Sequence, residues 1–523
     1  MPYRYFAWMY DRNQPAQQPL PDQERQLRAM HLKECVRTSA LSLHVSEETP
    51  TLQISDTATV IGHLFTRDGV PITRKEQLPH HLRGPALRCH IVDHCWGAYL
   101  LIQSEAGGLS IMRDPEGGMP CLQHVREGAR FITSDLELAT LLGTYRKRLD
   151  WDAITHRLLY PDIKTAATCL DGIHELLPGT RLAIDASGAC IEGTWSPWHF
   201  MDPQQRHTNI DEAASAVRAA VETSTRSWAA ADRSILLELS GGLDSSIVGF
   251  SLKGSSASVA CNTLVTPVPG ADERRYAGLV ATLLGSDLHS DTLALDWIRP
   301  DFRQQAPTAT PRIGMLQHAT DTLMEQSRRL HGAASFFSGG GGDTVFSYIT
   351  SAAPAADAFR QMGVRHGVRA LRDLAELHQC TIWKAGRLAL RKLRRPPPSP
   401  YKPTVQFLMP SSTDCKAAHH PWLDAPTHAL PGERERVFAL ATTQVYRDSA
   451  PRGQLAHLRV PLLSQPVMEA TLRVPSWMWI AGGRNRAVAR RAFADVLPPD
   501  ILHRRSKGSF TGHIGALYAR HRH

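Results

Sequence analysis

The sequence predicts two domains of different fold class. We expect an α+β domain with antiparallel sheets over residues 1–204, and an α/β domain with a doubly wound parallel sheet and extra helices over residues 205–523. Three observations support this division. A chain of 523 residues is too long for a single hydrophobic core. Short strand-like runs between turn residues fill the first part of the chain. After residue 205, apolar strands alternate with segments of helical periodicity, which indicates a parallel sheet.

The composition excludes several classes of protein. Hydrophobic residues make up 42% and charged residues 21%, which is ordinary for a soluble globular protein. No apolar run approaches the roughly 20 residues of a membrane span, and the start Met1–Phe6 lacks the pattern of a secretory signal. The nine cysteines show neither Cys-x-x-Cys nor a zinc spacing, so we expect reduced thiols, a cytoplasmic location and no membrane partner. The net charge of +9 comes with no nucleic-acid-binding module. This charge is consistent with binding of an anionic nucleotide or an acidic peptide, or it reflects only an arginine-rich composition.

The N-terminal domain is predicted from four strands and one short helix. Tyr3 to Tyr10 is rich in aromatic residues, and Thr59 to Phe65 ends before an Arg-Asp-Gly turn. Cys95 to Gln103 and Leu109 to Asp114 flank an Ala-Gly-Gly turn, which is typical of an antiparallel pair. Leu136 to Leu142 is predicted as a helix. These elements indicate an antiparallel, sheet-rich domain.

The C-terminal domain is predicted from alternating helices and strands. We expect strands at residues 234–239, 259–265 and 334–337, and helices at residues 211–230, 274–284, 315–330, 357–393 and 487–496. Ligands bind beyond the C-terminal ends of strands in such a sheet, so the segments that follow the strands are candidate sites. Residues 351–450 are the least informative and form a helical and basic insertion with a linker. Its basic run from Arg387 to Arg395 indicates a solvated helix, with a docking surface for a peptide or partner enzyme as the alternative.

The segment Leu239-Ser240-Gly241-Gly242-Leu243-Asp244-Ser245-Ser246 joins an apolar strand to a helix. Glycines let the backbone approach a ligand, and the amides of the turn and of the helix start suit an anion such as pyrophosphate. Asp244 has the wrong charge for a phosphate, so its presence implies a bridging Mg²⁺. The segment lacks the Gly-Lys-Ser/Thr ending of a Walker motif. For the Gly-Gly pair alone, an ordinary strand-turn-helix joint is the alternative.

A second glycine-rich segment, Ser338-Gly339-Gly340-Gly341-Gly342-Asp343, follows another apolar strand. A flexible loop is one interpretation. Four glycines that end in Asp after a buried strand favour a second backbone wall of the nucleotide site. Asp343 would then partner Asp244 in holding Mg²⁺.

These two segments resemble known loops. The first resembles the pyrophosphate-releasing loop of asparagine synthetases and N-type ATP pyrophosphatases, and the second resembles the Ser-Gly-Glu-Gly-Ser-Asp loop of asparagine synthetase. The resemblance implies ATP and Mg²⁺ as cofactors, an ATP pyrophosphatase fold, and Asp244 and Asp343 as metal ligands. The nucleotide contacts implied in the same way are Leu239, Ser240, Gly241, Gly242, Asp244, Ser245, Ser246, Val265, Ser338 and Gly339.

Gly340 departs from the asparagine synthetase pattern, which has a Glu that manages the nitrogen nucleophile at this position. The β-lactam-forming relatives have a Tyr there, and a glycine can replace neither side chain. In this loop, and again in Pro461-Leu462-Leu463-Ser464-Gln465-Pro466, the chain resembles the isopeptide-forming macrolactam synthetases of lasso peptide biosynthesis.

The N-terminal half resembles the Ntn-type glutaminase domain of asparagine synthetase. Arg113-Asp114-Pro115-x-Gly117-Gly118 and Leu176-Leu177-Pro178-Gly179-Thr180 fall where that domain has matching strings. The glutaminase uses an N-terminal Cys whose own α-amine acts as base. Pro2 stands at that place, and Cys35, the earliest cysteine, lies inside the chain. We therefore expect a degenerate domain without glutamine hydrolysis, and a nucleophile other than ammonia.

Three residues near the C-terminus are candidate catalytic groups. Lys507 matches a family lysine beside the α-phosphate and the reacting carbonyl, where a cation would stabilise developing charge; a surface lysine is the alternative. Glu469 is our candidate for positioning or deprotonating the amine. The simpler alternative is that its negative charge only stabilises the N-terminus of a helix. Arg490 matches a helix arginine of the family and would support the site.

The resemblance implies an ATP-dependent lasso peptide cyclase. Such an enzyme would adenylate an Asp or Glu side chain of a precursor peptide, and the peptide's own N-terminal amine would close a macrolactam, releasing AMP and pyrophosphate. It also implies a leader peptidase partner that exposes this amine. The alternatives are another amide ligase of the same fold (a β-lactam synthetase or an asparagine synthetase without glutaminase activity) and a non-catalytic peptide-binding scaffold. Gly340 argues against the first, and retention of Asp244, Asp343 and Lys507 argues against the second.

Overall fold

The computed structural model describes residues 2–10, 20–105, 108–125, 130–267, 272–295, 308–311, 315–395, 399–406, 408, 415–447, 451–504, 508 and 511–520. Contacts divide the chain into two compact units. Unit 1 comprises the residues up to Ser196 and the described parts of 303–313 and 401–421, and unit 2 comprises the rest. No helix among the described residues is long and apolar enough to cross a membrane.

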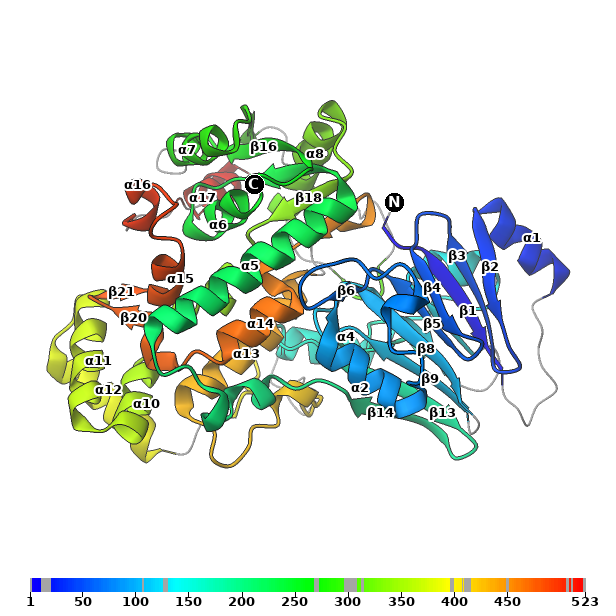
Figure 1. The fold of residues 1–523 in the computed structure, drawn as a ribbon, viewed down its shortest axis with the longest axis horizontal. Coiled ribbons are helices and arrows are strands. Elements are labelled where there is room, and N and C mark those ends of the chain that lie inside the picture. The colour runs from blue at the N-terminus through cyan, green and yellow to red at the C-terminus, as the bar shows by residue number, and fades with distance from the viewer. Residues whose placement is uncertain are drawn as a thin grey trace. The chain divides into compact units, whose positions relative to one another are not determined.

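Unit 1 is built on two six-stranded antiparallel sheets, with the strand orders β12-β10-β11-β1-β3-β2 and β14-β13-β9-β8-β5-β4 (Figure 1). Its strands are β1 (Tyr5–Met9), β2 (Leu32–Arg37), β3 (Leu41–Ser46), β4 (Thr51–Ser55), β5 (Ala58–Gly62), β6 (Phe65–Thr66), β7 (Cys95–Trp96), β8 (Tyr99–Glu105), β9 (Gly108–Arg113), β10 (Leu122–His124), β11 (Arg130–Thr133), β12 (His174–Glu175), β13 (Thr180–Asp185) and β14 (Gly188–Gly193). Its helices are α1 (Pro21–Ala29), α2 (Gly84–His94), α3 (Leu136–Leu141) and α4 (Trp151–Leu159).

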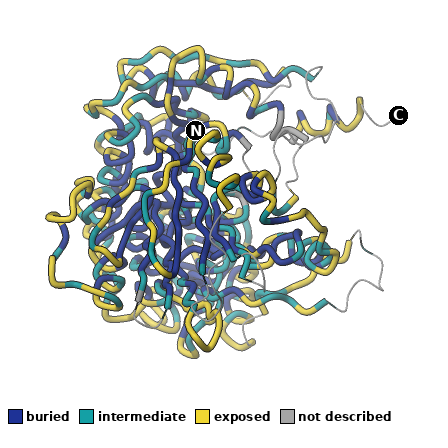
Figure 2. The backbone as a smooth tube through the Cα atoms, turned by 90° about the vertical axis from the view of Figure 1, so that its right-hand side faces the viewer, coloured by how far each residue is buried: buried dark blue, intermediate teal, exposed yellow. Residues whose placement is uncertain are grey.

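The core of the first sheet explains this arrangement. Phe6 and Trp8 alternate along β1 and share a buried cluster with Leu27 of α1 and Leu136 of α3, so these helices cover that face of the sheet. Long runs of buried backbone, dark blue in Figure 2, mark such strands. The predicted antiparallel class of this domain is confirmed.

One predicted strand is broken in two. The run Cys95–Gln103 forms β7 and β8 instead, because Gly97 takes a φ of +138° between them. A side chain at this position would lie 2.3 Å from the carbonyl oxygen of His63, so only glycine fits the bend.

Two later segments belong to unit 1, although the sequence placed them in the second domain. The Cys169 amide donates to the carbonyl of Ala309 at 3.0 Å, and the Thr404 amide donates to the carbonyl of Leu159 at 2.6 Å. Backbone hydrogen bonds of this kind depend on tertiary contacts and have no signature in local sequence.

Unit 2 contains a parallel five-stranded sheet with the strand order β17-β16-β15-β18-β19. Its strands are β15 (Ser234–Glu238), β16 (Ser258–Val265), β17 (Leu288–Thr292), β18 (Ser335–Ser338) and β19 (His457–Arg459), with a hairpin of β20 (Ile480–Ala481) and β21 (Arg484–Asn485). Its helices are α5 (Ile210–Asp232), α6 (Leu243–Ser251), α7 (Arg274–Leu284), α8 (Met315–Leu330), α9 (Gly342–Val345), α10 (Ala353–Met362), α11 (Val364–Leu377), α12 (Ile382–Arg394), α13 (Pro431–Arg447), α14 (Gln465–Leu472), α15 (Ala487–Ala492), α16 (Pro499–Leu502) and α17 (Thr511–Arg520).

Helices pack on both faces of this sheet. Leu236 of β15 shares a buried cluster with Met324 of α8. The next residue, Leu237, points to the other face, where a Cβ on Gly249 of α6 would lie 3.4 Å from it. The strand order also reverses between β15 and β18. The predicted doubly wound sheet is confirmed, and its ligand crevice is expected where the order reverses.

The predicted helical region from Asp357 to Leu393 is three helices in the structure, α10, α11 and α12. The breaks occur at Gly363 (φ +81°) and at Gln379 (φ +48°). The basic residues of α12 are mostly exposed, but Lys392 forms an ion pair with Glu435 of α13. The predicted helix 487–496 is also shorter, since α15 ends at Ala492.

A buried carboxyl ties α10 to α13. Asp357 accepts hydrogen bonds from the Gly432 amide at 3.0 Å and from the Ser476 hydroxyl at 2.6 Å. Burial raises the pKa of Asp357 to about 7, although these two donors act in the opposite direction.

Candidate active site

A cavity of about 1170 Å³ in unit 2 opens where the strand order reverses. Its walls come from the C-terminal ends of β15, β16 and β18, the loops that follow β15 and β18, the end of α11, one face of α13, and the segment around β21. This is the position at which doubly wound sheets bind ligands.

The loop between β15 and α6 is braced by its own serines. The Ser240 and Ser245 hydroxyls lie 3.1 Å apart, and the Gly242 amide donates to the Ser240 hydroxyl at 3.3 Å. The Ser246 hydroxyl donates to the Gly242 carbonyl at 2.7 Å. These bonds fix the loop so that the start of α6 faces the cavity. The first amides of a helix have no hydrogen-bond acceptor within the helix. The arrangement suits an anionic group.

The loop after β18 packs against this first loop through its glycines. A Cβ on Gly339 would lie 2.5 Å from the Ser245 amide nitrogen, and a Cβ on Gly342 would lie 2.3 Å from Cγ of Asp244. Both contacts are too short for any side chain. Gly340 differs, because its nearest neighbours would be Val460 Cγ1 at 3.5 Å and the Ser338 hydroxyl at 3.6 Å. Packing therefore requires glycine at 339 and 342 but leaves room for a side chain at 340.

The two carboxylates predicted to hold a metal meet at one arginine. Nη1 of Arg486 donates to Asp244 Oδ1 at 2.8 Å, and the same guanidinium forms an ion pair with Asp343. Carboxylate oxygens are the ligands that Mg²⁺ prefers, so the pair fits this ion. No group of three or more His, Cys, Asp or Glu side chains suited to a metal occurs in the part of the chain that the structure describes. Phosphate oxygens or water would have to complete the coordination.

A second arginine holds the segment that leads toward Lys507. Arg504 donates to the Gly241 carbonyl at 3.1 Å and pairs with Glu273 at 2.6 Å. Its guanidinium lies 3.9 Å from the centre of the Tyr276 ring. The Gly508 amide donates to the same Glu273 at 3.0 Å. Arg504 and Gly508 are therefore held near the first loop, whereas Lys507 lies outside the described residues.

The floor of the cavity contains a buried ion network. Arg452 pairs with Glu238 of β15 at 2.5 Å and with Asp321 of α8. Burial acts against the charge of Arg452, but the two carboxylates outweigh it and raise the pKa of this guanidinium. The network joins β15, α8 and the residues before β19 beneath the nucleotide loops.

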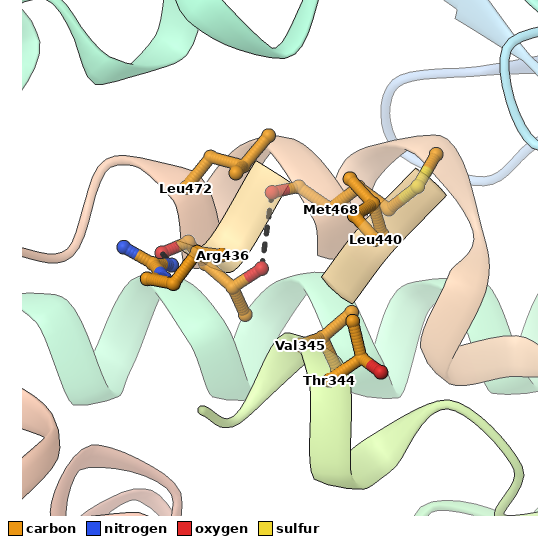
Figure 3. A pocket seen from close by; sticks show the side chains of 7 residues that line it. Thr344, Val345, Arg436, Leu440, Met468 and Leu472 are labelled. Atoms are coloured by element: carbon orange, nitrogen blue, oxygen red, sulfur yellow. Dashed lines mark hydrogen bonds between the residues drawn. The ribbon is translucent and has the colours of Figure 1, made fainter. Parts of the chain in front are cut away.

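A small void lies behind the second loop and is too small for a ligand (Figure 3). It measures about 10 Å³ and is bordered by residues of α9, α13 and α14. The half-buried Arg436 borders it and donates to the carbonyls of Thr471 and Val474, each at 2.6 Å. Burial lowers the pKa of Arg436 to about 10. A cation on these terminal carbonyls stabilises the end of α14 and fixes the helix that supports α9.

Nine of the residues predicted from the sequence line the large cavity. They are Leu239, Ser240, Gly242, Asp244, Ser245, Ser338, Gly339, Asp343 and Arg490. Burial lowers the pKa of Arg490, as do the neighbouring charges of Arg486 and Arg484. Arg490 also donates to the carbonyls of Asn485 and Leu502, which ties α15 to α16.

Four predicted residues with described positions are not on the cavity wall. The carbonyl of Gly241 accepts a hydrogen bond from Arg504, and the Ser246 hydroxyl donates to the Gly242 carbonyl within the loop. Val265 is buried at the end of β16. Glu469 is buried on α14, where it accepts a hydrogen bond from the Gln465 amide group at 2.7 Å.

The structure adds Glu376 to the candidates. Five carboxylates line the cavity, and Glu238, Asp244, Glu273 and Asp343 each pair with an arginine. For Glu376, the described residues supply no such pair. It lies at the end of α11 against Gly483, where a Cβ would come within 2.3 Å of its carboxyl carbon. No local pattern marks Glu376 or Arg486 in the sequence, because their significance comes from segments far away in the chain.

The sheet, the two glycine-rich loops and the paired carboxylates together form an α/β domain with a cavity at the edge where the strand order reverses. The family model for asparagine synthase matches residues 216–522, which is more than half of the chain. The chain therefore belongs to the asparagine synthase family, whose members are ATP-dependent ligases. No curated protein matches the chain.

Two of the solved structures that are similar to the chain illustrate the match. One is the glutamine phosphoribosylpyrophosphate amidotransferase from B. subtilis in complex with ADP and GMP, at 12% identity and a TM-score of 0.24, covering 64% of this chain and 90% of that one. The other is described as the allosteric regulatory enzyme of purine biosynthesis, at 12% identity and a TM-score of 0.23, covering 64% of this chain and 84% of that one. Similarity this low carries no conclusion about the present chain.

Proposed function

We propose that this asparagine synthase family member is a lasso peptide cyclase, an ATP-dependent ligase that closes a macrolactam in a precursor peptide. The supporting observation is the space beyond the nucleotide loops. The cavity of about 1170 Å³ exceeds the roughly 300–1,000 Å³ of ordinary small-molecule sites. Gly340 adds to that space, because packing does not require a glycine there. A nucleotide and a bulky acyl substrate would fit together.

The first step would form an acyl-adenylate. An oxygen of an Asp or Glu side chain of the peptide attacks the α-phosphorus of ATP, and the bond to the β-phosphate breaks to release pyrophosphate. Asp244 and Asp343 would hold Mg²⁺, which neutralises the charge of the β- and γ-phosphates when bound. The amides at the start of α6 would face the leaving pyrophosphate. Lys507 is the expected cation at the α-phosphate.

The second step would form the amide bond. The peptide's N-terminal amine attacks the activated carbonyl carbon, AMP leaves, and the nitrogen gives up a proton. An α-amine with a pKa of about 7.7–8.0 is partly protonated at neutral pH, so a nearby carboxylate would assist by taking up the proton that it loses. Glu376 lies on the cavity wall and would take this role, whereas Glu469 is buried and is not part of the cavity wall. Because both reacting groups belong to one peptide, the attack is intramolecular and saves the entropy of bringing in a second molecule.

Three thiols of unit 1, those of Cys35, Cys95 and Cys121, support an amine that comes with the substrate. A glutaminase needs a cysteine with a lowered pKa. Burial instead raises the pKa of Cys35 and Cys95 to about 12 and that of Cys121 to about 11. The Cys35 thiol also donates to the Leu43 carbonyl within the sheet. The precursor would reach the enzyme after a partner leader peptidase has exposed its N-terminal amine.

The test is ATP–pyrophosphate exchange with synthetic peptides that carry one internal Asp or Glu and a free N-terminus. Exchange should require the peptide, and the product should have lost one water by mass. The same peptide with an acetylated N-terminus should still support exchange but should not cyclise. Exchange with free aspartate, or release of asparagine, would contradict the proposal.

A further inference from the structure

Arg486 occupies the place between the two metal-binding carboxylates. It contacts Asp244 at 2.8 Å and pairs with Asp343, and only 8% of its side chain is exposed. Its guanidinium also lies 5.2 Å from the centre of the Tyr348 ring. The guanidinium therefore offers both carboxylates a cationic partner in the nucleotide-free site.

The backbone of Arg486 is unusual for a non-glycine residue. It has φ +58° and ψ +34° and forms the N-cap of α15. A left-handed conformation at such a residue is strained and persists only where the surroundings hold it. The β20–β21 hairpin, with Ala481 opposite Arg484, fixes the chain just before it. The fold therefore keeps a strained residue whose side chain is directed at the carboxylates.

Arg486 and Mg²⁺ compete for the same oxygens. Mg²⁺ needs ligands at about 2.0–2.1 Å in an octahedral arrangement, and the guanidinium occupies the Oδ1 atom of both Asp244 and Asp343. A bound nucleotide changes this balance, because its phosphates bring further oxygen ligands for the metal. The phosphates could also form a charge-assisted hydrogen bond with the guanidinium once the metal has displaced it.

We propose that Arg486 is a positioning residue that holds Asp244 and Asp343 together in the nucleotide-free enzyme and makes metal binding conditional on nucleotide. The inference rests on the proposed function only in taking these carboxylates as the Mg²⁺ ligands. It implies that free Mg²⁺ binds weakly and that metal and nucleotide enter together.

The test counts protein-bound Mn²⁺ by electron paramagnetic resonance, with and without the non-cleavable analogue α,β-methylene-ATP. The full-length wild-type protein should bind Mn²⁺ in this site only with the analogue. Arg486→Asn removes the guanidinium but keeps a residue that tolerates the left-handed conformation. Without nucleotide, this variant should bind Mn²⁺ about 10- to 100-fold more tightly, the range that corresponds to losing one charge-assisted competitor.

The matched control is Arg484→Asn. Arg484 lines the same cavity on the same hairpin, but its guanidinium contacts His503 at 2.6 Å instead of the carboxylates. Its Mn²⁺ affinity should equal that of the wild type. Arg486→Gln serves as a second variant, and thermal unfolding shows that each variant is folded.

Two outcomes would overturn the proposal while leaving Asp244 and Asp343 as metal ligands. One is nucleotide-independent Mn²⁺ binding by the wild type, which needs no variant to observe. The other is a folded Arg486→Asn protein with unchanged affinity. If Mn²⁺ binds with the analogue as expected but no peptide supports pyrophosphate exchange, the cyclase function fails and the role of Arg486 stands. If Mn²⁺ does not bind even with the analogue, the carboxylates are not metal ligands and both ideas fail.

Discussion

Gly342→Ala should disable the adenylation site through one methyl group. The new Cβ would lie 2.3 Å from Cγ and 2.7 Å from Oδ1 of Asp244. Carbon atoms pack at about 3.5–4.0 Å, so Asp244 would have to move by about 1 Å or more. A displacement of this size in a catalytic group costs on the order of 100-fold in rate. Gly342 has no left-handed φ, so the effect is steric and not a matter of backbone strain.

The assay is peptide-dependent ATP–pyrophosphate exchange together with the thermal unfolding temperature. Exchange should fall about 100-fold, and overpacking of about 1–3 kcal/mol should lower the unfolding temperature by several degrees. Gly340→Ala is the matched control in the same loop, because its Cβ would meet only ordinary contacts at 3.5 and 3.6 Å. It should keep the wild-type unfolding temperature and its affinity for α,β-methylene-ATP. Wild-type exchange in Gly342→Ala, or equal losses in both variants, would refute this reasoning.

Three further predictions concern single side chains. Glu376→Gln should slow ring closure at least tenfold and leave pyrophosphate exchange unchanged, whereas Glu469→Gln should leave ring closure at the wild-type rate. Ring-closure rates are measured by mass spectrometry, and a wild-type rate in Glu376→Gln would remove Glu376 from the mechanism. Asp357 has a folded pKa of about 7 against an ordinary value of 3.8, so its contribution to stability is complete below about pH 3.8 and is lost as the pH rises through about 7. This amounts to about 4 kcal/mol, and Asp357→Asn should flatten the dependence of unfolding temperature on pH between 4 and 8. Lys507→Ala should abolish exchange but retain nucleotide binding by calorimetry, and an active variant would exclude this lysine.

Local sequence patterns predicted the elements around the site well. The helix bounds Arg274–Leu284 and Met315–Leu330 are confirmed, because each segment has a buried stripe at helical spacing. The first ends at Gly285 with φ +67°, the usual signal for a helix stop. Prediction was poorer where a single glycine bends an apolar run, as at Gly97, since hydrophobic periodicity does not report backbone angles.

The convergence of Asp244 and Asp343 also followed from sequence. Both residues come just after strands that were expected to belong to one parallel sheet, and parallel strands end at the same edge of a sheet. In the structure, β15 and β18 pair in register, and both carboxylates line the cavity.

The sequence by itself thus determined the two fold classes, the nucleotide loops and the pair of carboxylates, because each is encoded within a dozen neighbouring residues. Only the tertiary structure decided that Arg486 lies between those carboxylates, 242 positions from Asp244. Only the structure placed Glu376 on the cavity wall and buried Glu469 away from it. Such contacts depend on the path of the chain through the whole unit, and no local propensity specifies that path.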